Sequence, residues 1–256
     1  MTVPQLVATA ADSASDAPLL ILGPSLGTAG GVLWSTTIPL LRDRFRIVSW
    51  DLPGHGVSPK ATAPFTIRDL AEGVVAILDD LGAEHAFYAG VSIGGGTGLQ
   101  LALDHPDRFD KVAIICSGYR FATPESWHER AAQVRAQSTS SLVVASAQRW
   151  FAPGRMAADP VTSGMILHNL RDADDESYAL ACEALAQFDL EPRLGDITIP
   201  VLDVWGDKDP TVAWETALKV ASTVPQGAAV AIQDAAHLAT VDQPKATAEA
   251  LIDFLS

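Results

Sequence analysis

The pentapeptide GVSIG at residues 90–94 constrains the fold of this chain more than any other feature. Residues 86–89 form an apolar run typical of a buried strand, and residues 93–103 predict a helix whose small side chains allow close packing on a sheet. A sharp strand-to-helix turn needs glycine at its outer positions and holds the central serine in a strained, exposed conformation. The pattern therefore predicts a nucleophile at Ser92, with a merely structural turn as the alternative.

Strand and helix patterns alternate along most of the chain, which is typical of a mostly parallel sheet covered by helices on both faces. With 256 residues, of which 48% are hydrophobic and 19% charged, the chain fits one large globular α/β domain. Further apolar runs predict strands at residues 19–22, 45–50, 111–116, 201–205 and 228–232. Residues 8–16, which are rich in alanine, are interpreted as a surface loop or hairpin.

Capping signals in the sequence mark where helices begin and end. Thr66 and Asp69 form a capping-box pattern, which predicts a helix that starts there and ends at Gly82. A closing helix is expected to begin near Pro244.

The alternation breaks between residues 120 and 190, where the pattern is helical and amphipathic and no clear strand occurs. Seventy residues exceed what one crossover requires, so we interpret this stretch as a helical cap inserted between two strands. The core domain would then comprise residues 1–119 and 191–256. An ordinary outer layer of helices is the alternative.

Composition limits the function classes. A formal net charge of −14 argues against nucleic-acid binding and means that an anionic substrate would need a local arginine. The apolar runs are too short to span a bilayer, and no signal peptide is expected. Cys116 and Cys182 lie in a strand pattern and a helical pattern, which suits buried reduced thiols and a cytoplasmic protein. The oligomeric state stays open.

A serine nucleophile needs a base, and His237 is the strongest candidate. It follows the last predicted strand in a short loop, and ligands of open α/β sheets bind at the carboxyl ends of the strands. A structural loop histidine is the alternative. The remaining histidines are expected to shape a loop, lie at element ends or fall in the cap: His55, His85, His105, His128 and His168.

The base needs an acid, and two carboxylates follow the strand at residues 201–205. Asp209 is favoured because the proline after it disfavours helical geometry and projects it into the loop. Asp207 remains the alternative. The order serine, aspartate, histidine is that of α/β-hydrolases.

The oxyanion of acyl transfer needs backbone donors. The amides of Ile93, directly after the serine, and Leu26, in the glycine-containing loop at residues 23–28, are the expected donors. A plain turn is the alternative for that loop. The sequence has no short spacing of metal ligands and no dinucleotide-binding motif, so no metal or cofactor is expected.

These motifs resemble the α/β-hydrolase superfamily over essentially the whole chain, including DLPGHGVS at 51–58 and the acid motif at 206–209, which supports Asp209. Within it, the chain is most similar to 3-oxoadipate enol-lactonases. The residues that carry this likeness are SLGT at 25–28 followed by Trp34, TPESW at 123–127, RWF at 149–151, CEAL at 182–185, FDL at 188–190 and AAHL at 235–238. The chain departs from that family around Trp34 and at residues 118–120.

The resemblance implies hydrolytic opening of a small lactone acid to 3-oxoadipate in aromatic-compound degradation, the β-ketoadipate pathway, without a cofactor. The small anionic lactone would be the partner, with its carboxylate paired to an arginine of the cap, Arg135 before Arg130, because charge-assisted bonds in a dry pocket are strong. Trp127 and Trp150 would wall the pocket. The alternative is that these tryptophans are core residues and these arginines are solvated.

Other functions fit the same triad. A general carboxylesterase and a cofactor-free perhydrolase would use the same acyl-enzyme chemistry. A small-molecule receptor would use the triad only as a ligand pocket. The SLGT loop favours the lactonase over the receptor.

Overall fold

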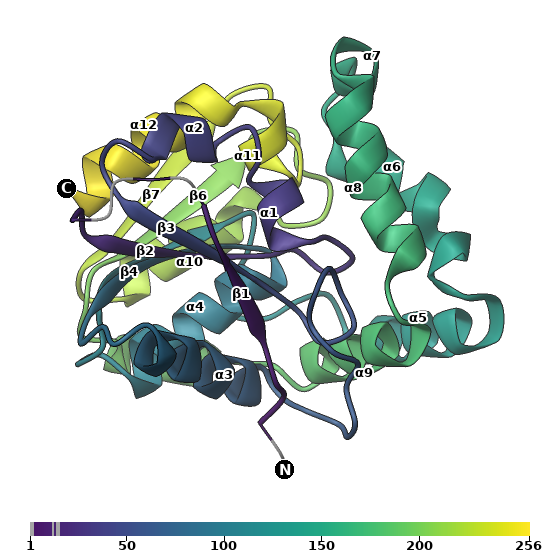
Figure 1. Cartoon of the computed structure of the whole chain (residues 1–256), viewed down its shortest axis with the longest axis horizontal. Helices are drawn as coiled ribbons and strands as arrows, with labels where there is room; N and C mark the ends of the chain where they lie inside the picture. The colour runs from purple at the N-terminus through teal and green to yellow at the C-terminus, as the bar shows by residue number, and fades with distance from the viewer. Residues whose placement is uncertain (1–2, 12, 14–15) are drawn as a thin grey trace.

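The computed structural model describes residues 3–11, 13 and 16–256 (Figure 1). Within these residues the centre of the molecule is a seven-stranded sheet in the order β1-β3-β2-β4-β5-β6-β7. The strands are β1 (Val7–Ala10), β2 (Leu19–Gly23), β3 (Arg46–Asp51), β4 (Ala86–Val91), β5 (Phe109–Ile115), β6 (Val201–Gly206) and β7 (Gly227–Ile232). Only β1 runs antiparallel to its neighbour, so the sheet is mostly parallel, as predicted.

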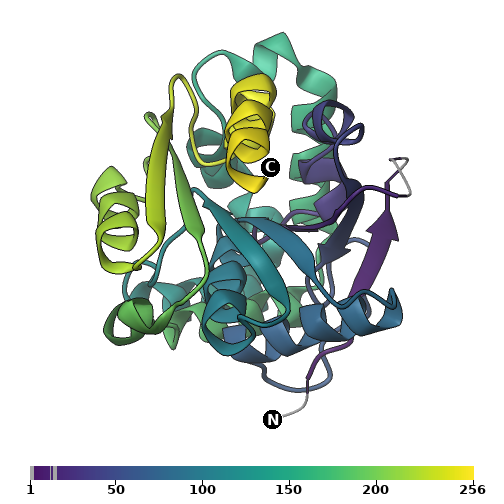
Figure 2. The same ribbon diagram turned by 90° about the vertical axis from the view of Figure 1, so that its left-hand side faces the viewer.

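Helices cover both faces of the sheet (Figures 1 and 2). On one face α12 packs against α2, and on the other α3 packs against α4. The helices are α1 (Gly30–Leu33), α2 (Ile38–Leu41), α3 (Ile67–Asp80), α4 (Ile93–Asp104), α5 (Pro124–Gln137), α6 (Val143–Trp150), α7 (Arg155–Ala158), α8 (Pro160–Asp172), α9 (Asp175–Ala186), α10 (Trp214–Thr223), α11 (Ala239–Asp242) and α12 (Pro244–Leu255). Short 3₁₀ helices occur at Thr139–Leu142 and Glu191–Asp196.

The central strands read as unbroken apolar runs because helices bury both of their faces. Every residue of β2 is buried, and so are the last four residues of β5. The predicted strands are all present, each longer or shifted by one or two residues at an end. These buried strands form a rigid base whose carboxyl ends carry the loops discussed below.

Residues 8–16 differ in part from the expected loop or hairpin. Residues 7–10 form the edge strand β1, which pairs with β3 from Val7 opposite Asp51 to Ala10 opposite Val48. An edge strand bonds on one side only and is half exposed, so its short Val-Ala-Thr-Ala sequence lacks the apolar run of a central strand. Residues 12, 14 and 15 of the predicted loop lie outside the described residues.

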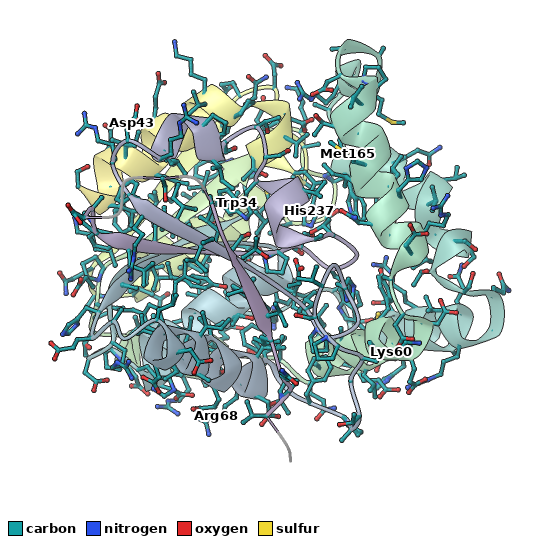
Figure 3. All side chains as sticks on the ribbon, viewed as in Figure 1. Trp34, Asp43, Lys60, Arg68, Met165 and His237 are labelled. Carbon is teal, nitrogen blue, oxygen red and sulfur yellow. The ribbon has the colours of Figure 1, made fainter. Side chains whose placement is uncertain are left out.

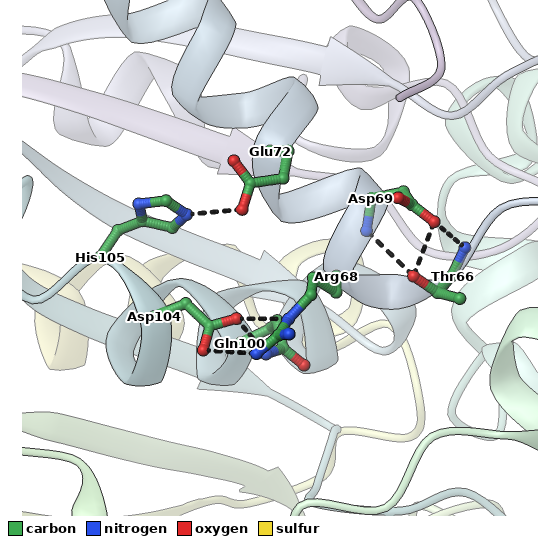
Figure 4. A network of polar contacts seen from close by, with 7 residues as sticks. All are labelled: Thr66, Arg68, Asp69, Glu72, Gln100, Asp104 and His105. Carbon is green, nitrogen blue, oxygen red and sulfur yellow. Dashed lines mark hydrogen bonds and ion pairs between the residues drawn. The ribbon is translucent and has the colours of Figure 1, made fainter. Parts of the chain in front are cut away.

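Helix α3 begins at the predicted capping box, in which the Asp69 amide donates to Thr66 Oγ1 at 3.1 Å and the Thr66 amide donates to Asp69 Oδ2 at 2.8 Å. Its exposed edge is linked to α4 by polar side chains (Figure 4). Arg68 donates two hydrogen bonds to Asp104, each 2.9 Å long. Because Arg68 and Asp104 are joined by a bidentate pair, α4 is held in place from its solvent side.

The segment at residues 120–190 carries α5 to α9 and projects beyond the end of the sheet, at the right of Figure 1. Its two ends lie together, because Arg120 forms an isolated antiparallel bridge with Asp189 and the Leu190 amide donates to Tyr119 O at 2.8 Å. Helices α5 and α9 pack against each other next to this junction. The segment therefore leaves and re-enters the core at one narrow point.

Candidate active site

Ser92 lies on the turn between β4 and α4, with φ 55° and ψ −119°. A side chain with a Cβ rarely adopts a positive φ, so this backbone is strained and depends on its surroundings. The Ser92 amide donates to Ile115 O at 2.9 Å, and its carbonyl accepts from the Gly96 amide at 2.9 Å and from Ser117 Oγ at 2.7 Å. Neighbouring strand and helix thus hold Ser92 in a conformation that it would not adopt alone.

The two outer glycines of the pentapeptide are required by the backbone around them. A Cβ on Gly90 would lie 2.3 Å from Gly94 O, and a Cβ on Gly94 would lie 2.5 Å from Pro24 O. Both distances are far below van der Waals contact, and backbone atoms cannot swing aside as a flexible side chain could. The glycine pattern read from the sequence therefore has a direct steric cause.

His237 follows β7 and is hydrogen-bonded to Asp209, with 2.9 Å between Nδ1 and Asp209 Oδ2. Their side chains are 4% and 0% exposed, respectively. The second oxygen of Asp209 accepts from the Thr211 amide at 2.7 Å, which fixes the carboxylate. Asp207 instead forms a 2.8 Å ion pair with the exposed Lys208. The structure thus puts Asp209, and not Asp207, against the histidine.

Ser92 and His237 line one cavity of about 320 Å³ at the carboxyl edge of the sheet. Leu26 lines it from the loop after β2, and Trp127, Arg130 and Trp150 line it from α5 and α6. His237 lies between the core and the helices that follow β5 (Figure 3). None of the other five histidines lines this cavity. Side chains from the loop after β2, the turn between β4 and α4, helices α5 and α6 and the loop after β7 therefore converge on one cavity.

The amides of Leu26 and Ile93 point to no hydrogen-bond acceptor within the described residues. The Gly94 amide donates to Pro24 O at 3.0 Å, which ties the loop after β2 to the start of α4. Thr28 supports the same loop, since the Ser25 amide donates to Thr28 Oγ1 at 3.1 Å. These contacts explain the SLGT motif as a scaffold that leaves the Leu26 amide free.

The expectation that Arg135 faces the substrate is wrong. Its guanidinium donates to Glu176 at 2.7 and 2.8 Å and to Glu183 at 2.5 Å, and it does not line the cavity. These glutamates of α9 hold Arg135 at the α5–α9 contact. Arg130, five residues or about 1.4 turns earlier on α5, lines the cavity.

Sequence reasoning missed Arg149, which lines the cavity from α6. The only sequence signal was its place beside Trp150 in the RWF segment, and no periodicity distinguished it from a solvated arginine. Trp127 and Trp150 line the cavity and are also 9% and 5% exposed, so they are core and wall residues at once.

Asp242, in α11, was also missed. Its Oδ2 accepts from the Ala236 amide at 2.8 Å and from the Ala152 amide at 2.9 Å. The Leu238 amide donates to Trp150 O at 3.0 Å. Residues on both sides of His237 are thereby bonded to the end of α6 or to the residues that follow it. Burial raises the pKa of Asp242, while its backbone hydrogen bonds oppose that shift.

Within the described residues, no group of three or more His, Cys, Asp or Glu side chains could hold a metal ion. Cys116 and Cys182 are free and buried, and burial raises the pKa of both thiols. No helix in the described part of the chain is both long and apolar enough to cross a membrane.

Comparisons with known proteins agree with this fold. The family model described as "alpha/beta hydrolase fold" matches residues 18–244. The chain is 33% identical to 3-oxoadipate enol-lactonase 2 of Acinetobacter baylyi, over 91% of this chain and 86% of that protein. It is 30% identical to the putative carbamate hydrolase RutD of Caulobacter sp. (strain K31), over 95% and 92% of the two chains.

A solved structure is similar over nearly the whole chain. The crystal structure of the enol-lactonase from Burkholderia xenovorans LB400 has a TM-score of 0.93 and 32% identity, covering 98% of this chain and 96% of that one. All three relatives are named as hydrolases, which supports hydrolase activity for this protein. The chain therefore belongs to the α/β-hydrolase fold family, within which it is similar to the 3-oxoadipate enol-lactonases.

Proposed function

We propose that the protein is a serine hydrolase that opens the ring of 3-oxoadipate enol-lactone, a small carboxylated lactone, to give 3-oxoadipate. The observation that carries the proposal is the convergence on one cavity of a strained Ser92 and a His237 bonded to Asp209. Similarity to two enol-lactonases, one by sequence and one by structure, supports this lactone as the substrate.

Acylation begins when Ser92 Oγ attacks the lactone carbonyl and His237 Nε2 takes its proton. Asp209 accepts the hydrogen bond from His237 Nδ1, which selects the tautomer with Nε2 free and stabilises the imidazolium that forms. The amides of Leu26 and Ile93 donate to the oxyanion. Collapse of the tetrahedral intermediate breaks the ring C–O bond and leaves an acyl-enzyme.

The leaving group makes this ring an easy one to open. It departs as an enolate, which is less basic than an alkoxide, and it becomes a ketone once protonated. The ketone does not readily close the ring again. The His237 imidazolium gives its proton to this enolate and becomes neutral again. His237 then removes a proton from water as the water attacks the acyl-enzyme, and it returns that proton to Ser92 Oγ as the second product carboxylate is released. Arg130 pairs with the carboxylate that the substrate carries from the start.

Replacing Ser92 with alanine tests the proposal. Purified Ser92→Ala protein should lose enol-lactone hydrolysis by on the order of 10⁴-fold or more, measured as the ultraviolet absorbance loss of the lactone. Ser222→Ala is the matched control, since Ser222 lies on the exposed surface of α10 and bonds only to Lys219 O. Retained lactonase activity in Ser92→Ala, or none in the unaltered protein, would contradict the proposal.

Carbamate hydrolysis is the second candidate, favoured by the 30% identity to the RutD relative. A carbamate has a more basic leaving group than an enol-lactone, so His237 would have to protonate it on departure. Parallel assays on the lactone and on small carbamates separate the two reactions. A higher kcat/KM for the carbamate would favour the second candidate.

We further propose that residues 120–190 act as a cap over the cavity and that the protein is cytoplasmic. The cap is supported by the cavity-lining side chains of α5 and α6 and by the bridge between Arg120 and Asp189, where the segment leaves and re-enters the core. The location is supported by two buried free thiols, because such thiols suit a reducing compartment.

A further inference from the structure

The two amides that would hold the oxyanion each share a peptide unit with a carbonyl of the preceding residue. The Ile93 amide shares its peptide plane with Ser92 O, and the Leu26 amide shares its plane with Ser25 O. The described residues contain no cis peptide bond. A trans peptide unit is planar, so its N–H and C=O groups point in opposite directions. Whatever holds these two carbonyls therefore also sets the direction of the two amides.

A buried hydroxyl donates to the first of these carbonyls. Ser117 Oγ lies 2.7 Å from Ser92 O, the ordinary length of a hydroxyl–carbonyl hydrogen bond, and Ser117 is 1% exposed. Ser92 O also accepts from the Gly96 amide at 2.9 Å, within the first turn of α4. The peptide that carries the Ile93 amide is therefore held from the end of β5 as well as by its own helix.

The chain around Ser117 is shaped to bring its hydroxyl to this position. Cys116 directly follows β5 and has φ 46°, which turns the chain through a conformation that residues with a Cβ rarely adopt. The Cys116 amide donates to Val204 O at 2.7 Å, which holds this turn against β6. A Cβ on Gly95 would lie 2.4 Å from both Cβ and Oγ of Ser117. Glycine at position 95 therefore leaves the space that the Ser117 side chain fills.

The second amide has the same arrangement. Thr28 Oγ1 donates to Ser25 O at 2.8 Å, and the Thr28 amide donates to the same carbonyl at 3.0 Å. Thr28 is 0% exposed. Its hydroxyl accepts from the Ser25 amide, so its one proton is available for Ser25 O. Two peptide units from separate parts of the chain thus have a free amide at one end and a hydroxyl-bonded carbonyl at the other.

A hydrogen bond to a carbonyl strengthens the N–H of the same peptide unit as a donor, because linked hydrogen bonds polarise one another. Donors that are already oriented need no rearrangement when negative charge develops on the substrate oxygen. Neither Ser117 nor Thr28 lines the cavity. Both hydroxyls can therefore affect the oxyanion only through the peptide units that they hold.

We propose that Ser117 and Thr28 are positioning residues of the oxyanion hole, each of which orients and strengthens one backbone donor through the carbonyl of its peptide. The inference rests on the part of the proposed function in which the amides of Leu26 and Ile93 hold an oxyanion. It does not depend on the lactone, because any ester that Ser92 attacks develops the same charge at the same place.

Trifluoroacetone tests the inference because it forms an oxyanion without the lactone. Ser92 Oγ adds to its carbonyl carbon, the electron pair of the C=O bond moves to the oxygen, and the serine proton passes to His237. Fluorine NMR measures the Kd of this adduct, and p-nitrophenyl acetate gives kcat/KM. Ser117→Ala and Thr28→Val should each raise Kd and lower kcat/KM by a similar factor, on the order of tenfold, since removing a donor outright costs about 10²- to 10³-fold.

Conservative variants and a matched control separate positioning from stability. Thr28→Ser keeps the hydroxyl and should stay close to the unaltered protein, and Ser117→Cys keeps only a weak S–H donor and should fall between serine and alanine. Thr139→Val is the control, because Thr139 is also 0% exposed but donates to Arg171 O at 3.1 Å, away from the cavity. It should lower the melting temperature and leave Kd unchanged. Titration with a serine-directed phosphonate expresses all values per reactive Ser92.

Several results would overturn the inference. They are an unchanged Kd in Ser117→Ala and Thr28→Val, an equal rise of Kd in Thr139→Val, equal effects of Thr28→Ser and Thr28→Val, or no adduct with the unaltered protein. If the lactone is hydrolysed while one of these holds, the proposed reaction stands and the positioning role is wrong. If Kd responds as expected but the lactone is not hydrolysed, the positioning role stands and the proposed substrate is wrong.

Discussion

Asp207 and Asp209 lie two residues apart in one loop, yet their surroundings give them different chemistry. Asp209 is withdrawn from solvent, accepts from the Thr211 amide and contacts His237. Asp207 pairs with Lys208, and the hydrogen bond from Lys208 is the main reason why the pKa of Asp207 is lowered, as expected for an exposed ion pair. At the residue scale, then, burial and hydrogen-bond partners separate a catalytic candidate from a solvated acid of the same type.

Asparagine at each position tests this difference. Asp209→Asn should reduce lactonase kcat by on the order of 10³- to 10⁴-fold, because the amide no longer stabilises the imidazolium and can favour the wrong tautomer of His237. Asp207→Asn should change kcat by less than about twofold, because it removes the exposed pair with Lys208 but keeps an oxygen that can accept from the Asp234 and Ala235 amides. Steady-state kinetics on both proteins checks the prediction. Equal losses of kcat in the two variants would mean that Asp209 is not the acid that supports His237.

At the element scale, α11 connects the loop of His237 to the end of α6. Asp242 joins the Ala236 and Ala152 amides, while Leu238 bonds to Trp150. Helix α6 supplies cavity-wall residues, and the loop supplies the base. Because α11 holds these two pieces together, we expect the distance between the base and the cavity wall to depend on Asp242, which does not itself line the cavity.

Asp242→Ala should therefore lower kcat more than it changes KM, by on the order of 10- to 100-fold, through displacement of His237. It should also lower the melting temperature, because the buried Ala236 amide and the partly buried Ala152 amide lose their acceptor. Asp242→Asn keeps one acceptor oxygen and should recover part of kcat. Asp253→Asn, on the exposed surface of α12, is the control. A lower melting temperature with unchanged kcat would make Asp242 purely structural.

At the scale of the whole molecule, the buried sheet includes one acid without a partner. Asp203 lies in β6 with 0% exposure, and neither carboxylate oxygen has a hydrogen-bond partner in the described part of the chain. Burial raises its pKa well above 3.8. The folded state therefore binds this proton more tightly than the unfolded state, so Asp203 favours folding most below pH 3.8, and that contribution falls as pH rises towards the folded pKa.

Asp203→Asn removes this titration and should gain stability relative to the unaltered protein as pH rises. The difference in free energy of unfolding between the two proteins, from urea denaturation at pH 5 and pH 8, should shift towards the variant at the higher pH by on the order of 1 kcal/mol or more. All other titrating groups are shared and cancel in the difference. A difference that is independent of pH would show that Asp203 does not titrate between the two states in this range.

Much of the fold follows from short stretches of sequence. The capping box at Thr66 and the buried strand β2 were predicted within a residue or two, because a cap is made by neighbours in the chain and a fully buried strand must be apolar along its length. The edge strand β1 was not predicted, because its pairing with β3 supplies what its own sequence lacks.

The candidate site shows the same difference between features set by neighbouring residues and features set by distant ones. The sequence by itself determined that Ser92 stands on a strained turn, since the glycines that the turn requires are adjacent in the chain. Only the tertiary structure decided between Arg130 and Arg135, which point about 140° apart around α5 at 100° per residue. Which of these directions faces the cavity is set by α6, α9 and the loops of the core. Packing between distant segments is a non-local property, and helical periodicity alone carries no record of it.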